Sequence, residues 1–361
     1  MARFNFNPGP AALPKSVLET AQKEFTNYDS THMSVLELSH RSKSYEDIHF
    51  EAVKRLRSLL DIPEQYEVLF LQGGASQQFA MVPMNFLNSE QSASYIVSGS
   101  WSEKALKEAK SIGQAEIYAS TKDTNYTKIP DVHSIQNINE KTAYVHLTSN
   151  NTIYGTQWRD FPETDTTPLI ADMSSDILSR RFDVRSFSLF YAGAQKNLGP
   201  SGVTVVVADR QFLEKSRKDI PTIFSYQTHV EKHSLYHTPP TFSIYMLNLV
   251  LKWVEEQGGI DAIESLNKQK AEKLYDAIDH SNNFYKGHAE VASRSAMNVT
   301  FTLENKELEE LFLQEAEEAG FSGLKGHRSV GGLRASLYNA VPLEAVNALC
   351  SFMDDFRHRH Q

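Results

Sequence analysis

Residues 190–207 read FYAGAQKNLGPSGVTVVV and place a lysine, Lys196, between two apolar segments. Lysine is rarely buried without a partner, so a lysine inside an apolar stretch needs a physical reason. The segment after it is rich in valine, a residue that favours β-strands. Gly193 and Gly199 leave room for another group to come close to the backbone. The stretch therefore predicts two buried strands whose connection carries Lys196.

Short apolar runs continue on the N-terminal side of this stretch, and helical segments separate them. Near-continuous apolar runs are typical of strands that are covered on both faces. Their alternation with helices predicts an α/β fold, in which a mostly parallel sheet lies between layers of helices. The predicted strands are residues 67–72, 94–99, 142–149, 168–174, 188–192 and 203–209.

The C-terminal part of the chain has a different pattern. Residues 243–259 predict a helix closed by a pair of glycines, and a second helical stretch starts at Asp261. Residues 296–303 and 332–339 resemble strands, and the helical segment between them ends at Gly320. The last segment has the apolar stripe of an amphipathic helix, at positions 343, 346, 349, 350, 353 and 356.

The length of 361 residues suggests about two domains. We expect a large domain over residues 16–259, which contains the sheet. Residues 260–361 are expected to form a smaller α+β domain, with which residues 1–15 pack.

The composition argues against several classes of function. The chain has 36 Lys and Arg against 45 Asp and Glu, a net charge of −9, which disfavours general binding to nucleic acid or anionic membranes. Its single cysteine, Cys350, cannot form an intrachain disulfide, which fits a reducing compartment. The N-terminus has no secretory signal, and no apolar run is long enough to span a membrane. We therefore expect a cytoplasmic protein.

Two predicted strands end at residues that suit a specific chemistry. Asp172 closes one strand, with Ser174 and Ser175 just after it, and Lys196 follows the next strand. Alone, Asp172 could be a turn residue, and Lys196 could extend into solvent. Together, at the sheet edge where α/β proteins bind ligands, they match the needs of pyridoxal phosphate. The lysine forms a Schiff base with its aldehyde, and the aspartate pairs with its pyridine nitrogen.

Three other stretches could hold the rest of this cofactor. The turn around Ala75 and Ser76 leads from a strand into a helix, whose N-terminus favours a phosphate. Trp101 could stack on the pyridine ring or pack in the core. Thr152 lies in a polar segment after a strand, where it could donate to a phenolic oxygen or simply form a turn.

Basic side chains gather in two places despite the negative net charge. One place is a His-Arg pair, and the other combines a second His-Arg pair with one more arginine near two glycines. Arginine binds carboxylate and phosphate groups with two parallel hydrogen bonds. A solvated basic loop is the alternative for either place alone. Together they predict a site for a ligand with more than one anionic group, formed by His40, Arg41, His327, Arg328 and Arg334.

With these residues in view, the chain resembles the class-V aminotransferases, which are pyridoxal-phosphate enzymes of fold type I. The resemblance extends over nearly the whole chain and is closest to the members that act on phosphoserine. It rests on nine motifs in family order: NFNPGPAALP, ELSHRSKSYEDI, LQGGASQQFAMVP, GSW, SNNTIYGTQW, ADMSSDILSR, YAGAQKNLGPSGVTVVV, YHTPPTFSIYML and GHRSVGGLRASLYNA.

The resemblance implies a role for each candidate residue. Lys196 would carry the cofactor, and Asp172, supported by Ser174, would face its ring nitrogen. Arg334 would bind the α-carboxylate of the substrate, and the two His-Arg pairs its distal anion, partly from a second subunit of a homodimer. The remaining cofactor contacts would come from Ala75, Ser76, Trp101, Thr152 and Gln195, and from His237 and Thr238 across the dimer.

Two positions depart from the pattern of the family. His237 stands where the family usually has asparagine, so the charge at this position depends on pH. Ser76 stands where some members have an arginine for the substrate phosphate, which leaves more of that task to the two His-Arg pairs.

The function implied is transamination between O-phospho-L-serine and 2-oxoglutarate, giving 3-phosphohydroxypyruvate and L-glutamate, as serine biosynthesis requires. A phosphorylated hydroxythreonine of vitamin B6 synthesis is a further substrate in some members. A cysteine desulfurase would need a mobile nucleophilic cysteine, whereas Cys350 falls on the apolar stripe of the last helix. An alanine–glyoxylate aminotransferase would not need five cationic groups. A binding protein without activity would not need the lysine, aspartate, tryptophan and arginines together.

Overall fold

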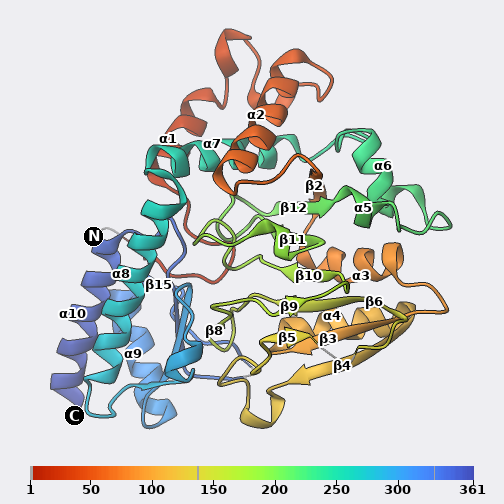
Figure 1. Cartoon of the computed structure of the whole chain (residues 1–361). Helices are drawn as coiled ribbons and strands as arrows, with labels where there is room; N and C mark the ends of the chain where they lie inside the picture. Colours follow the sequence, from red (N-terminus) through yellow and green to blue (C-terminus); the bar gives the residue numbers. More distant parts are fainter. Residues whose placement is uncertain (1–2, 136–137, 329) are drawn as a thin grey trace.

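The computed structural model describes residues 3–135, 138–328 and 330–361. A seven-stranded sheet forms its centre (Figure 1). In spatial order the strands are β2 (Tyr66–Gly73), β12 (Gly202–Asp209), β11 (Leu189–Gly193), β10 (Leu169–Asp172), β6 (Thr142–Thr148), β3 (Ser92–Val97) and β4 (Gln114–Ser120). β12 is antiparallel to both of its neighbours, and the other neighbouring pairs are parallel. The prediction of a mostly parallel sheet is confirmed.

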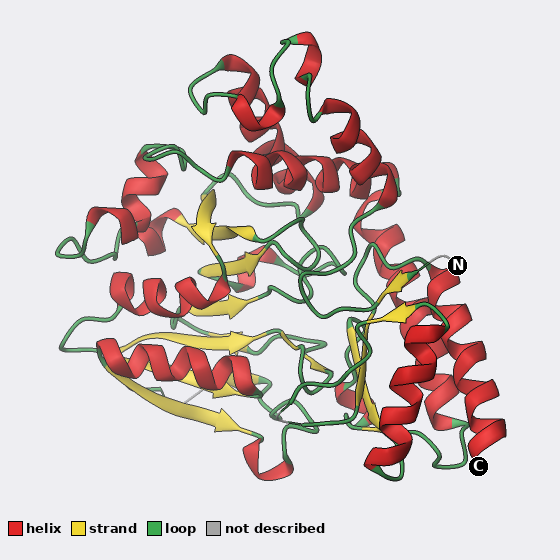
Figure 2. Cartoon of the chain, turned by 180° about the vertical axis from the view of Figure 1, so that it is seen from behind, coloured by secondary structure: helices red, strands yellow, loops and turns green. Residues whose placement is uncertain are grey.

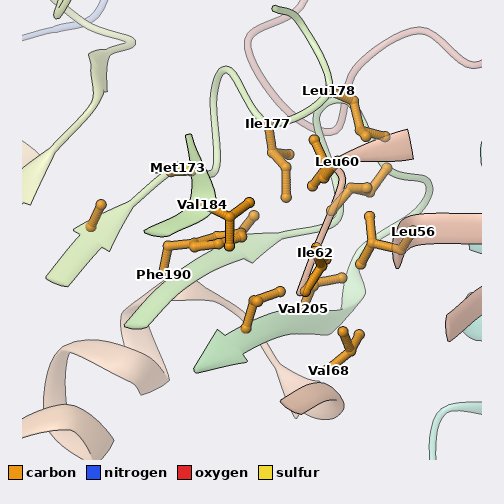
Figure 3. Close-up of a cluster of buried hydrophobic side chains, with 14 of the residues drawn as sticks. Leu56, Leu60, Ile62, Val68, Met173, Ile177, Leu178, Val184, Phe190 and Val205 are labelled. Carbon is orange, nitrogen blue, oxygen red and sulfur yellow. The ribbon is translucent and has the colours of Figure 1, made fainter. Parts of the chain in front are cut away.

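Helices cover both faces of this sheet, which explains the continuous apolar runs. Successive side chains of a strand point to opposite faces, and in β2 both sets are buried. Val68 and Phe70 pack with α2 (Lys43–Leu59) and α7 (Thr241–Glu256). Figure 3 shows part of this cluster. On the other face, Leu69 and Leu71 pack with α3 (Ala75–Phe86) and α4 (Ser100–Ile112).

Some boundaries differ from those predicted. β4 was not predicted because it is an edge strand whose side chains are exposed or half-buried, so it lacks a continuous apolar run. β3 ends at Val97 rather than at residue 99, because the backbone N–H groups of Ser98 and Gly99 bind the Ser102 hydroxyl at the start of α4. The helix predicted over 243–259 ends at Glu256.

The C-terminal part contains a second, three-stranded sheet, in the order β13 (Lys286–Gly287), β14 (Asn298–Thr302) and β16 (Leu333–Ser336). It shares a hydrophobic cluster with α8 (Gly259–Asp279), α9 (Lys306–Glu318) and α10 (Leu343–His360). β1 (Phe4–Asn5) pairs with β15 (Phe321–Ser322) beside them. Both ends of the chain lie on this side of the molecule (Figure 2). The stripe of α10 faces the cluster, and Cys350 packs half-buried against it.

The remaining elements are three further α-helices, 3-10 turns and short strands. They are α1 (Lys15–Glu24), η1 (Tyr28–Ser30), η2 (Val35–Glu37), η3 (Lys122–Thr124), β5 (Ser134–Ile135), β7 (Asn150–Asn151), β8 (Thr156–Gln157), β9 (Glu163–Thr164), η4 (Val184–Ser186), α5 (Arg210–Leu213), η5 (Thr222–Phe224), α6 (Tyr226–Glu231) and η6 (Val291–Ser293). Among the described residues, no helix is both long and apolar enough to cross a bilayer.

Candidate active site

Lys196 lies in the connection between β11 and β12, at the sheet edge where β6, β10 and β11 end. Its side chain is buried, and Nζ donates hydrogen bonds to Thr152 Oγ1 over 2.8 Å and to Ser175 Oγ over 2.7 Å. Burial lowers the pKa of Lys196 to about 8; Asp172 acts against this shift, and Arg334 adds to it. The amine is therefore much closer to deprotonation at neutral pH than that of an exposed lysine.

Asp172 is the last residue of β10, and its carboxylate is held in a fixed orientation. Its Oδ1 accepts hydrogen bonds from the backbone N–H of Ser174 over 2.9 Å and from the Ser174 hydroxyl over 2.6 Å. Ser174 Oγ in turn accepts from the Gly193 N–H over 3.0 Å. Burial raises the pKa of Asp172, while the Ser174 hydroxyl and Lys196 lower it. Among the described residues Oδ2 has no donor, which leaves it available to a ligand.

Thr152 is held at the site by the tight hairpin of β7 and β8. Gly155 closes the hairpin with a φ of +71°, a conformation that other residues rarely adopt. Its N–H donates to the Asn151 backbone oxygen over 2.8 Å. Thr152 Oγ1 lies 2.7 Å from Ser175 Oγ. The hairpin thus supplies one of the two hydroxyls that accept hydrogen bonds from Lys196.

A cavity of about 240 Å³ opens at this edge of the sheet. One wall is the turn between β2 and α3, where the first N–H groups of the helix lie free of intrahelical partners. The cavity is lined by Pro8, Gly9, Gly74, Ala75, Ser76, Trp101, Thr148, Asn150, Thr152, Ile153, Asp172, Ser174, Ser175, Gln195, Lys196, His327 and Arg334.

Arg334, which is buried, and Trp101, which is half-buried, both line this cavity and have hydrogen-bond donors without a partner among the described residues. Arg334 extends from β16, and its Nη1 donates to the Thr152 backbone oxygen over 3.4 Å. Nε of Arg334 and Nε1 of Trp101 are both buried, and neither has a hydrogen-bond partner among the described residues. The Lys196 ammonium lies 5.9 Å from the Trp101 ring centroid. Burial lowers the pKa of Arg334 and of His327, and the nearby Arg334 lowers that of His327 further.

Five of the candidate residues do not line the cavity of this chain. His40 is half-buried and Arg41 exposed, in the connection before α2. His237 forms a hydrogen bond with Gln72 through its Nε2 over 2.9 Å. Thr238 and Arg328 are exposed. The other ten candidates share the cavity: Ala75, Ser76, Trp101, Thr152, Asp172, Ser174, Gln195, Lys196, His327 and Arg334.

Ser175 is a residue at the site to which sequence reasoning assigned no role. It follows Ser174 and contacts Lys196 directly, and its place in the ADMSSD segment was the only available signal. Pro8 and Gly9 were also missed, because they contribute backbone rather than functional side chains. Within the described residues, no group of His, Cys, Asp or Glu side chains is arranged to hold a metal ion.

Comparison with known proteins agrees with this geometry. The model of the aminotransferase class-V family matches residues 3–349. A phosphoserine aminotransferase from Lysinibacillus sphaericus is 61% identical over 358 residues, which cover 99% of each chain. A solved phosphoserine aminotransferase, studied for radiation damage of its Schiff base, is 58% identical with a TM-score of 0.97, and the match covers 99% of this chain and 100% of that one.

A more distant structure names the cofactor. The phosphoserine aminotransferase of Trichomonas vaginalis, solved with pyridoxal phosphate bound, is 38% identical with a TM-score of 0.91, over 98% of this chain and 99% of that one. The chain therefore belongs to the class-V aminotransferase family and, within it, to the phosphoserine aminotransferases.

Proposed function

We propose that this protein transfers an amino group between O-phospho-L-serine and 2-oxoglutarate, with pyridoxal phosphate as its cofactor. The observation that carries the proposal is the buried Lys196 beside the buried Asp172, in a cavity that also holds Arg334. The products are 3-phosphohydroxypyruvate and L-glutamate, so the reverse direction supplies serine biosynthesis.

The residues present fit the cofactor. Asp172 Oδ2 is available to accept a hydrogen bond from the ring nitrogen, and burial favours such pairing because an unpaired buried carboxylate is costly. The N-terminus of α3, with Ala75 and Ser76, and Gln195 would hold the phosphate. Trp101 would stack on the ring, and Thr152 would donate to its phenolic oxygen. When bound, pyridoxal phosphate accepts the electron pair that remains when the amino acid loses its Cα proton.

Lys196 would hold the cofactor and then move the proton. Its Nζ would be the attachment point for the cofactor in the resting enzyme, and it would be free to act as a base once the amino acid is bound. A pKa of about 8 leaves a fraction of the amine neutral at physiological pH, so Nζ can take the proton from Cα. The hydroxyls of Thr152 and Ser175 keep Nζ in place through the hydrogen bonds already present in this structure.

The substrate anions would be bound by arginine and histidine. Arg334 would bind the α-carboxylate, because it lines the cavity and a guanidinium can form two parallel hydrogen bonds with a carboxylate. His327 and Arg328 would bind the distal phosphate of phosphoserine or the distal carboxylate of glutamate. We propose that a homodimer completes this pocket, with His40 and Arg41 contributed from the second subunit. Such a pocket could also accept phosphorylated hydroxythreonine.

His237 and Thr238 would reach the cofactor phosphate of the second subunit. Within this chain His237 forms a hydrogen bond with Gln72, which precedes the glycine turn, so the proposed reach to the second subunit rests on the resemblance to the family. Because position 76 is a serine, Ser76, rather than an arginine, binding of the distal anion would depend more on Arg328 and on the His40–Arg41 pair.

We also propose a division into a large domain over residues 16–259 and a small one over 260–361, with residues 3–15 packed on the small domain. The pairing of β1 with β15 supports the last point. The single cysteine, which fits a reducing compartment, supports a location in the cytoplasm.

The proposal is tested by comparing amino donors on the purified protein loaded with pyridoxal phosphate. Phosphoserine, serine and alanine are each supplied with 2-oxoglutarate, and glutamate is measured. We expect phosphoserine to have the highest kcat/KM by about a hundredfold or more, since serine and alanine lack the distal anion that the two His-Arg pairs would bind. Faster turnover of alanine would contradict the proposal.

A further inference from the structure

Asn197, the residue after Lys196, is buried and joins three segments of the chain through its side chain. Its Nδ2 donates to the backbone oxygens of Ser175 over 3.3 Å and of Ile177 over 3.0 Å, in the segment that follows β10. Its Oδ1 accepts from the backbone N–H of Asn339 over 3.0 Å, in the turn that follows β16. The function proposed above makes no use of this side chain.

The partners of this amide fix its orientation. A backbone N–H can only donate a hydrogen bond, and a backbone oxygen can only accept one. A flipped amide would place its own N–H groups against the Asn339 N–H and its oxygen against two backbone oxygens. Because a buried polar group without a partner is costly, Asn197 has one favourable orientation, in which it holds the backbone of Ser175.

Ser175, the residue held in this way, contacts Lys196 directly. Its backbone oxygen accepts from Asn197, while its hydroxyl accepts from Lys196 Nζ over 2.7 Å. The hydrogen bonds therefore close a ring that runs from the backbone of Lys196 through Asn197 and Ser175 back to Nζ. Because a lysine side chain is a flexible four-carbon stem, this ring limits the positions that Nζ can take.

The turn that follows β16 is anchored independently of Asn197. The fully buried ammonium of Lys270, on α8, donates to three backbone oxygens of residues 337–341 over 2.8–3.0 Å. The side chain of Asn339 also accepts from Asn267 Nδ2, on the same helix, over 2.8 Å. The turn is therefore a fixed support against which Asn197 holds the segment that follows β10.

We infer that Asn197 is a positioning residue for Lys196, which holds Ser175 in place so that its hydroxyl keeps the lysine amine at the edge of the cavity. For catalysis the inference rests on the proposed function, in which the free amine of Lys196 takes the Cα proton. In that state no bond to the cofactor fixes Nζ, so its position depends on the hydrogen bonds of the chain itself.

The test is the variant N197A in the full, cofactor-free chain, which leaves the Ser175 backbone oxygen without this donor. Ser175 can then move away from Lys196, and the ammonium loses one of the acceptors that stabilise it. We expect the pKa of Lys196 to fall by about half a unit to one unit, the effect of roughly one hydrogen bond. The measurement is the pH dependence of Lys196 modification by a small amine-reactive reagent, followed by peptide mass spectrometry.

Asn85 provides a matched control. It is buried near the end of α3, its Nδ2 donates to the backbone oxygens of Met81 and Phe224, each over 2.8 Å, and its Oδ1 accepts from the Tyr226 N–H over 3.1 Å. Since the two amides form the same kinds of hydrogen bonds, N85A should lower stability in the same way as N197A. We expect N85A to leave the titration of the lysine unchanged. An unchanged pKa in N197A, or an equal shift in N85A, would overturn the inference.

A second variant tests the route through the hydroxyl of Ser175. S175A removes the acceptor itself and should lower the pKa of Lys196 at least as much as N197A does. In the S175A background, N197A should add almost no further shift, because the two residues act through one contact. Fully additive shifts would contradict the route. An unchanged pKa in S175A would overturn the inference even should N197A fail to fold.

The cofactor-loaded enzyme provides a kinetic readout. Arg334 lies on β16, and the turn after this strand keeps its hydrogen bonds to Lys270 in N197A, so binding of the substrate carboxylate should persist. We expect kcat for phosphoserine to fall about tenfold, because a small displacement of a reacting group is costly, and KM to change by less than about twofold. A raised KM with unchanged kcat would contradict the inference. If the wild type does not turn over phosphoserine, the proposed function fails, while the titration of Lys196 still decides the role of Asn197.

Discussion

Burial is the largest influence on the Lys196 amine. It lowers the pKa of this group to about 8, although Asp172 raises it. At pH 7 about a tenth of such an amine is neutral, compared with far less than one per cent for an exposed lysine. Because the neutral amine is the nucleophile, burial makes Lys196 more reactive. The hydrogen-bond acceptors around it lower the free-energy cost of burying the protonated form.

Substitution of Asp172 should change the pKa of Lys196 in a defined direction. D172N removes the carboxylate that favours the ammonium form, so the pKa of Lys196 should fall below about 8. The measurement is the pH dependence of Lys196 modification by a small amine reagent in the cofactor-free protein, followed by peptide mass spectrometry. D219N, which changes an exposed carboxylate paired with Arg217, serves as the control. A midpoint that stays the same in D172N would show that the two groups do not interact.

Sequence reasoning at the scale of residues was strongest where a strand end carried an unusual side chain. Asp172 and Lys196 follow apolar runs, so topology alone predicts that they lie near each other. Ser175 carried no such signal, since buried hydroxyl groups are common and its partners Thr152 and Lys196 come from other parts of the chain. Only the packed structure shows that Ser175 contacts Lys196 directly.

At the scale of elements, the hairpin of β7 and β8 depends on Gly155. A Cβ atom at this position would lie 2.8 Å from the Asn298 backbone oxygen and 3.2 Å from the Thr300 backbone nitrogen. The φ of +71° adds strain for any other residue. The hairpin that presents Thr152 is therefore tightly packed on β14, and the site depends on this contact.

We expect G155A to lower the free energy of unfolding by about 1–3 kcal/mol. It should also weaken the binding of pyridoxal phosphate, because it displaces Thr152. Denaturant unfolding and cofactor titration measure the two effects. G287A is the matched control, since a Cβ atom there would make only ordinary contacts of 3.6 Å or more. Equal stability of G155A and wild type would contradict the account of the hairpin.

The elements of the sheet were predictable because strands covered on both faces contain continuous apolar runs. β4 lacks this feature, because at the edge of the sheet its side chains are exposed or half-buried rather than covered on both faces. The hairpin of β7 and β8 was anticipated only as a polar segment after a strand. Its conformation depends on the contact with β14, which is far away in the sequence.

At the scale of the whole molecule, the candidate site of one chain lacks part of its basic residues. His40 and Arg41 do not line the cavity, and the resemblance implied only that a second subunit supplies part of the two His-Arg pairs. The sequence predicts the participation of these residues only through the resemblance to a family, because no local pattern shows which subunit they serve.

Mixing two inactive variants tests this prediction. K196A lacks Lys196 but keeps Arg41, whereas R41A keeps Lys196 but lacks Arg41. In a hybrid dimer, the site with Lys196 receives Arg41 from the K196A subunit and regains activity. Unfolding and refolding an equal mixture should therefore recover about a quarter of wild-type activity, since half of the dimers are hybrids with one complete site. If Arg41 served its own subunit, activity would not rise above that of R41A alone.

We expect the protein to pass an amino group from phosphoserine to 2-oxoglutarate in two separate steps, both at Lys196. The most direct test supplies phosphoserine alone to the cofactor-loaded protein and measures the keto acid released. We predict about one equivalent of 3-phosphohydroxypyruvate per subunit, continued turnover only when 2-oxoglutarate is added, and none with K196A. Absence of keto-acid release from the wild-type protein, or its full release from K196A, would contradict the claim.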